Sequence, residues 1–210
     1  MTNGNDEPDK ARSEFLIAMY RELMADINRH IIVVWQSVGV VFGAFASFAL
    51  VEKNLLPLSV AVSLVLILCI WMLAHVYDAS YWYNRNLVII ANIERQFLRQ
   101  SDLKEIHYYF GKHRRAGAMI THLEIQKWLA VGVAALVLLV HAFEVDIPAV
   151  RAGQWLMPID ALPWLAAVVG VWAWHVSSRK ALSRYETFLR NSPGKPVDAS
   201  SIKDGPGHPT

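Results

Sequence analysis

Three histidines and one aspartate are the residues of this sequence whose types and positions could do chemistry. His75, His141 and His175 lie in or beside long apolar stretches, and Asp78 follows His75 by three residues. That spacing is close to one helical turn, so the imidazole and the carboxylate can lie side by side. The pair could bind a proton or a cation and, with His175, a metal. Because an ionisable side chain in a membrane needs a partner or water, we treat all four as candidates for an intramembrane or interfacial polar site.

The alternative is that these histidines are interfacial residues that hydrogen-bond to the backbone or to water. No apolar stretch has the paired-ligand spacing of a zinc or di-iron site, so we expect no metal. The sequence also lacks the glycine-rich nucleotide loops and the H-E-x-x-H and G-x-S-x-G motifs. We therefore expect no cofactor and favour a protein that is not an enzyme. A membrane enzyme would use His75, Asp78 and His175.

Four long segments with few or no charged residues position these candidates. The chain is 54% hydrophobic and 18% charged, which is more apolar than an ordinary soluble domain. A helix needs about 20 apolar residues to cross a hydrocarbon core of about 30 Å. The sequence therefore predicts an all-α, polytopic membrane protein with four transmembrane helices in two hairpins. The predicted spans are residues 31–51, 56–77, 125–144 and 160–178, within one domain of residues 10–190.

The basic residues predict the orientation of these spans. Of the twenty lysines and arginines, only Lys53 and Arg151 lie in the turns after the first and third spans. Because lysine and arginine are retained on the cytoplasmic side, both termini are predicted to be cytoplasmic. The charge bias, the short outer loops and the lack of an organellar targeting segment favour a bacterial inner membrane.

The cytoplasmic segments are predicted to be mostly helical. Apolar residues recur there at helical spacing, and no breaker separates residues 10–30 from the first span, so we expect one helix from about residue 9 to residue 51. The ends, residues 1–9 and 191–210, are polar or rich in proline and glycine and are predicted to be disordered. The predicted cytosolic helices are residues 10–30, 78–100, 102–115 and 179–190.

A strip of small residues in the first span predicts close helix packing. Gly39, Gly43 and Ser47 recur every four residues and expose the backbone to a neighbouring helix. The strip could mediate self-association, or it could pack against this chain's own spans, for example at Ala166 and Gly170 in the fourth. The spacing alone favours packing within the chain.

A basic group in the central cytosolic segment could bind anionic lipid headgroups. It consists of Lys112, Arg114 and Arg115. Each basic residue close to an anionic surface contributes about 1 kcal/mol of attraction. The same residues also serve as ordinary determinants of topology, which we consider the better explanation, and nucleic-acid binding is not expected.

The sequence leaves several functions open. We favour a non-enzymatic membrane protein that self-associates and couples its spans to a cytosolic helical bundle, as a channel-like or pore-like effector or as a membrane sensor. The alternatives are a small transporter or lipid-handling protein, a membrane enzyme, and an assembly subunit with an unknown protein partner. The lipid bilayer and a second copy of the chain are the expected partners.

Overall fold

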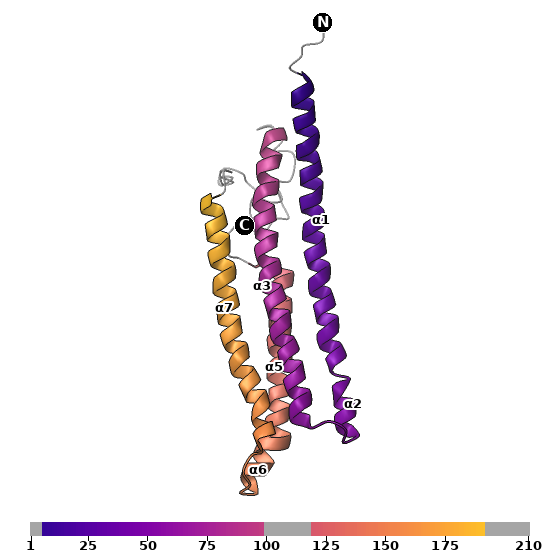
Figure 1. Ribbon diagram of the computed structural model, residues 1–210, viewed down its shortest axis with the longest axis vertical. Coiled ribbons are helices and arrows are strands. Elements are labelled where there is room, and N and C mark those ends of the chain that lie inside the picture. Colours follow the sequence, from indigo (N-terminus) through magenta and orange to yellow (C-terminus); the bar gives the residue numbers. More distant parts are fainter. Residues whose placement is uncertain (1–5, 99–118, 192–210) are drawn as a thin grey trace, which may run out of the picture. The chain divides into compact units, whose positions relative to one another are not determined.

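The computed structural model describes residues 6–98 and 119–191, and the regular elements of these residues are all helical (Figure 1). Four long helices dominate, as the sequence predicts. The elements in chain order are α1 (Asp6–Ala44), α2 (Ser47–Glu52), α3 (Leu58–Phe97), α5 (Thr121–His141), the π-helix η2 (Ala142–Asp146), α6 (Ile147–Arg151), the 3₁₀-helix η3 (Pro158–Ala161) and α7 (Leu162–Asn191).

The four long helical segments meet the length and hydropathy requirements of membrane spans. They are Asp9–Glu52, Leu58–Glu94, Thr121–Arg151 and Pro158–Asn191. Within residues 6–98 and 119–191 the chain therefore has four helical segments with the features of membrane spans, and these features indicate contact with a lipid bilayer.

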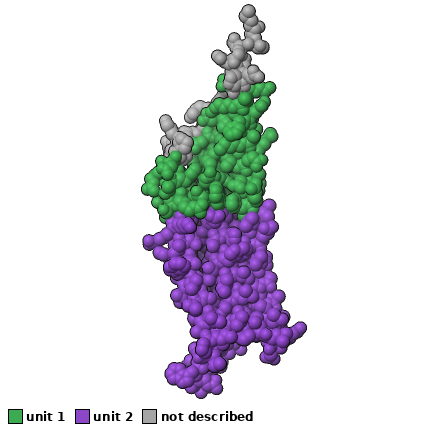
Figure 2. Space-filling model, in the orientation of Figure 1, with its two compact units in different colours: residues 1–31, 81–118, 182–210 green, residues 32–80, 119–181 purple. Residues whose placement is uncertain are grey.

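The described residues divide into two compact units (Figure 2). Unit 1 contains residues 6–31, 81–98 and 182–191, and unit 2 contains residues 32–80 and 119–181. Helices α1, α3 and α7 each contribute to both units. The predicted cytosolic extensions that fall on described residues are thus helical continuations of the long apolar segments. The predicted helix of residues 102–115 lies outside the described residues.

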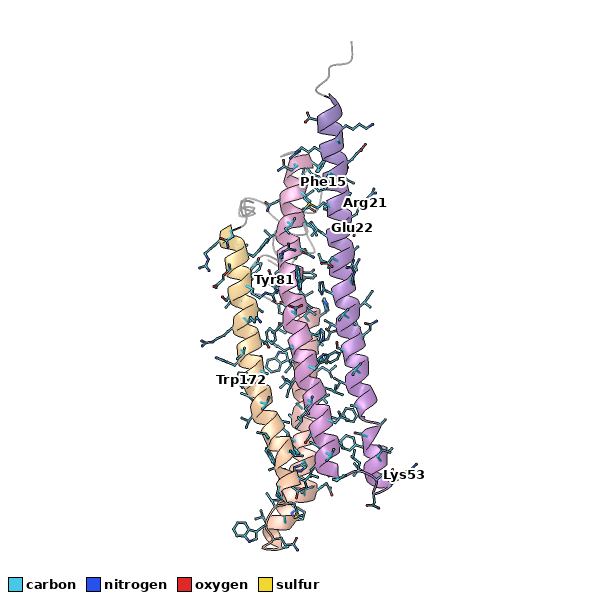
Figure 3. The ribbon with its side chains drawn as sticks, in the orientation of Figure 1. Phe15, Arg21, Glu22, Lys53, Tyr81 and Trp172 are labelled. Carbon is cyan, nitrogen blue, oxygen red and sulfur yellow. The ribbon has the colours of Figure 1, made fainter. Side chains whose placement is uncertain are left out.

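Unit 2 has an apolar core centred on α3. In the most apolar window of the α3 segment 56% of the residues are buried, against 6% for the α7 segment. Large apolar side chains on α7 are correspondingly exposed: Val168 by 68%, Val171 by 68% and Trp172 by 66%. Figure 3 shows Trp172 on α7. An outward apolar surface of this kind is unusual for a soluble protein and is expected for a helix that faces lipid. The main core cluster comprises Val38, Val41, Val62, Val65, Leu66, Cys69, Met72, Leu73, Ala130 and Val137.

Unit 1 is an antiparallel pairing of α1 with α3, to which α7 adds aromatic and cationic contacts. Ile27, Leu87 and Ile90 form its buried apolar cluster. Hydrogen bonds flank this cluster. The residue numbers of their partners rise along α1 and fall along α3, as expected for antiparallel helices. They join Arg12 to Gln96 at 3.3 Å, Tyr20 to Glu94 at 3.3 Å and Asn86 to Asp26 at 2.9 Å.

Aromatic residues 81 and 82 connect the helices of unit 1. The Arg184 guanidinium of α7 lies 4.1 Å from the ring centre of Tyr81. Trp82 stacks on His30 of α1 with ring centres 5.9 Å apart. Arg85 lies 5.0 Å from the ring centre of Trp82. These rings therefore contact the chain's own cationic and aromatic side chains.

The first long helix is interrupted where one continuous helix was expected. Helix α1 ends at Ala44, and residues 45 and 46 form a turn before α2 begins at Ser47. The Phe45 and Ala46 amides bond to carbonyls only three residues back, at 3.1 Å each, and the Ser47 hydroxyl donates to the Ala44 carbonyl at 2.7 Å. Competition by a serine hydroxyl and the weak helix propensity of Gly43 account for the tighter turn.

The third helical segment extends beyond its predicted end at residue 144. After His141 the helix widens into η2 and then continues as α6 to Arg151. The Ile147 amide donates to the Ala142 carbonyl, five residues back, which is the bond that defines a π-helix. The helix can include the charged residue Asp146 because its carboxylate accepts a hydrogen bond from Trp164.

Candidate functional site

The candidate site is a buried polar network around His141 in unit 2. His141 has no exposed surface, and Ser59 beside it is 2% exposed. The His141 Nε2 atom lies 3.2 Å from Ser59 Oγ, and its Nδ1 atom lies 3.5 Å from Asp146 Oδ2. The imidazole therefore lies between a hydroxyl from α3 and a carboxylate from η2. Such a group is costly to bury unless its polar atoms are paired.

Two residues from the start of the fourth helical segment complete the network. Ser59 donates a hydrogen bond to Asp160 Oδ1 at 2.6 Å, and the other Asp160 oxygen accepts from the Met157 amide at 3.2 Å. The Trp164 indole donates to Asp146 Oδ2 at 2.9 Å. Asp160 thus caps η3 while it holds Ser59, and Trp164 orients Asp146. The network joins α3, α5, η2, η3 and α7.

The hydrogen-bond directions determine where protons lie. Ser59 has a single hydroxyl hydrogen, which it donates to Asp160. The hydrogen between Ser59 and His141 must therefore belong to His141 Nε2. If the imidazole is neutral, its Nδ1 atom carries no hydrogen. Nδ1 and the Asp146 carboxylate are then both hydrogen-bond acceptors, and no hydrogen bond forms between them. A second proton on Nδ1 changes this contact into an attraction.

One nitrogen of His141 and one oxygen of Asp146 have no hydrogen-bond partner. His141 Nδ1 and Asp146 Oδ1 are both buried without a hydrogen-bond partner. The geometry therefore provides a buried place for one proton between an imidazole and a carboxylate.

The Ser59–His141–Asp146 arrangement resembles a nucleophile, a base and an orienting acid, but it does not have their hydrogen-bond pattern. A catalytic serine donates its hydrogen to the histidine. Here that hydrogen points to Asp160, and both Ser59 and His141 are enclosed. The arrangement can hold a proton, and it does not present a serine oxygen to a substrate.

The other predicted site residues do not join this network. His75 is partly buried and makes an edge contact with Trp71, with ring centres 4.5 Å apart. Asp78 and His175 are exposed. Among residues 6–98 and 119–191, no three histidine, cysteine, aspartate or glutamate side chains are grouped to hold a metal. His141 is thus the one of the four candidates that the structure encloses in a polar network.

The sequence analysis missed the partners of His141. Asp146 follows His141 by five residues, which in an α-helix points to a different face; the π-helical turn changes that geometry. Ser59 and Asp160 are 101 residues apart. The one signal available was that Asp146 and Asp160 lie on either side of the connection between the third and fourth apolar segments, the third of which contains His141.

The small residues of the predicted packing strips differ in their surroundings. A Cβ atom built on Gly39 or Gly43 meets no other atom within 4 Å, so the space beside both is open among the described residues. A Cβ atom on Gly170 would lie 3.0 Å from Ile70 Cγ1. Gly170 therefore permits close approach of α7 to α3, and Ala166 packs against the core of unit 2. The basic group Lys112, Arg114 and Arg115 lies outside the described residues.

Comparison of this chain with protein-family models, curated proteins and solved structures finds no match.

Proposed function

We propose that this chain is a non-enzymatic, multi-pass protein of the inner membrane that self-associates and acts as a membrane sensor. Its termini lie in the cytoplasm, and its input is the protonation of the His141–Asp146 pair near the outer ends of the spans. The observation that carries this proposal is the enclosed imidazole whose Nδ1 atom faces a carboxylate at 3.5 Å without a hydrogen bond. Ionisable groups within membrane spans usually have functional roles.

The output of the sensor is the cytosolic helical bundle formed by unit 1. Helices α1, α3 and α7 run without interruption across the boundaries at residues 31, 80 and 181. We propose that a shift of α7 after a change at Asp146 or Asp160 is transmitted along this continuous helix toward Arg184. There the contact of Arg184 with Tyr81 and the contact of Phe188 with Arg85 join α7 to α3 within unit 1, and a shift of α7 would change both.

Self-association is proposed to use the Gly39–Gly43 face of α1. Open space beside both glycines favours packing against a second copy over packing within the chain. Small residues every four positions allow two helix backbones to approach closely in lipid.

The sensor proposal is tested by a distance measured within unit 1. Spin labels are placed on cysteines that replace the exposed residues Phe15 and Leu189 in a Cys69→Ala background. Reconstituted protein is examined at about pH 7.5 and about pH 5.5, across the range in which histidine changes charge. The distance distribution should shift between these conditions. The shift should be lost in His141→Gln and kept in the matched variant His175→Gln, whose site is exposed. An unchanged distribution, or an equal shift in both variants, contradicts the proposal.

A further inference from the structure

An apolar cavity of about 210 Å³ lies between α3, α5 and α7 within unit 2. It is larger than the engineered apolar cavity of about 150 Å³ that stays free of water and binds benzene. Its walls on α5 and α7 are formed largely by small residues, including Ala134, Ala166 and Gly170. Small residues in membrane helices normally allow close contact. Here the small residues of α5 and α7 instead leave a space that α3, α5 and α7 surround.

The cavity is elongated along α7. Its wall on this helix extends from Ala166 to Trp174, and the eight rises of 1.5 Å between these residues give about 12 Å of helix. At the Trp174 end, the indole N–H donates to the Tyr77 hydroxyl, so that its one strong donor is already engaged. An occupant of this space therefore meets apolar walls and needs no hydrogen bonds from them.

The cavity reaches the outer surface of unit 2. Ala135 of α5 and Val171 of α7 line it, and both are exposed, Val171 by 68%. Their neighbours Leu136 and Val168 are exposed apolar side chains as well. In a membrane these surfaces contact hydrocarbon. A molecule that enters between α5 and α7 would therefore come from the lipid.

We propose that this cavity binds one acyl chain of a bilayer phospholipid. The inference rests on the proposed membrane location, because only there do acyl chains surround the opening between Ala135 and Val171. The elongated apolar space fits a flexible hydrocarbon chain, and water has no polar partner inside it. The lipid becomes part of the core of unit 2 and contacts α3, α5 and α7 together.

The test compares a cavity-filling variant with a matched surface variant. Protein is purified from membranes in mild detergent, stripped of loosely bound lipid, and examined by native mass spectrometry and phosphate analysis. The wild type should retain a phospholipid through repeated detergent exchange. Ala134→Phe fills the cavity and should lose that lipid. Leu136→Phe, on the same helix but on the exposed surface, should retain it.

The single cysteine gives a second readout that does not depend on purification of the lipid. Cys69 lines the cavity and is the only cysteine in the chain. Phosphatidylglycerol vesicles added to delipidated protein should slow alkylation of Cys69 by a small apolar thiol reagent several-fold. In Ala134→Phe the rate should not respond to vesicles, and Leu136→Phe should respond as the wild type does.

Each outcome supports or overturns the proposal. Equal phospholipid retention in the wild type and both variants would show ordinary surrounding lipid and overturn it. A free fatty acid or another apolar molecule in place of phospholipid would also overturn it. Recovery of the chain in the soluble fraction would refute the membrane location first. A membrane-bound protein with no retained lipid and no change at Cys69 would refute the cavity proposal alone.

Discussion

His141 Nδ1 and Asp146 Oδ2 lie 3.5 Å apart, brought together by one π-helical turn in the third helical segment. Neither an α-helix nor a loop would place residues five positions apart in this way with the backbone hydrogen bonds kept. π-Helical turns are rare and frequently occur at functional sites. The turn, the enclosed imidazole and the carboxylate held by Trp164 together form the most specific feature of the structure.

Replacement of Asp146 should lower the thermal stability of the protein. Asp146→Ala removes the acceptor of the Trp164 indole hydrogen bond and the carboxylate that faces the buried His141 ring. A hydrogen bond to a charged group contributes about 1.5–3 kcal/mol, and this one is exposed, so we expect a loss of stability of about 1–2 kcal/mol. Thermal unfolding in detergent, followed by circular dichroism, measures it. Glu144→Ala, at an exposed position on η2, is the control and should change stability by less than about 0.5 kcal/mol. Equal losses would contradict the role of the network.

The contact of Gly170 with Ile70 should leave too little room for a methyl group on residue 170. Gly170→Ala places a Cβ atom 3.0 Å from Ile70 Cγ1, so we expect a destabilisation of about 1–3 kcal/mol from overpacking. Gly132→Ala, where the new atom meets open space, is the control and should not destabilise. Ile70→Ala removes the clashing atoms, so the loss caused by Gly170→Ala should be smaller in that background. Additive losses would argue against the contact.

The Arg85 guanidinium should contribute to the stability of unit 1 through aromatic contacts. It lies 5.0 Å from the ring centre of Trp82 and 5.6 Å from that of Phe188. Cation–π contacts at exposed sites contribute about 0.5–1 kcal/mol each, so Arg85→Gln should lower the unfolding free energy by about 1 kcal/mol. Denaturant unfolding followed by tryptophan fluorescence checks this value. Trp82→Leu should reduce the effect of Arg85→Gln, and an unchanged effect would contradict the assignment.

Self-association should depend on the exposed glycines of α1. Gly39→Leu and Gly43→Leu fill the open space beside the helix and should abolish chemically cross-linked dimers in membranes. Gly132→Leu also enters open space, but on α5, and should leave the dimers intact. Dimers that persist in all three variants, or their absence in the wild type, would refute the proposed face.

The sequence predicted the elements better than the site. Charge-free segments and apolar periodicity depend on local composition, and they gave the all-α class and the four long helices. The continuation of α3 from Leu58 to Phe97 was visible in the spacing of apolar residues 89, 93 and 97. The pairing of Ser59 with Asp160 depends on how distant helices meet, and the pairing of His141 with Asp146 depends on a local change of helix type. Neither is encoded in a spacing that can be recognised along the chain.

The membrane arrangement is tested most directly by labelling from outside intact cells. Single cysteines replace Lys53, at the end of α2, or Ser201, in the carboxy-terminal tail, in the Cys69→Ala background. A membrane-impermeant maleimide should label the Lys53→Cys protein in intact cells and the Ser201→Cys protein only after the membrane is permeabilised. Labelling of Ser201→Cys but not Lys53→Cys in intact cells would contradict the proposed topology. Recovery of either protein in the soluble fraction would contradict the membrane location.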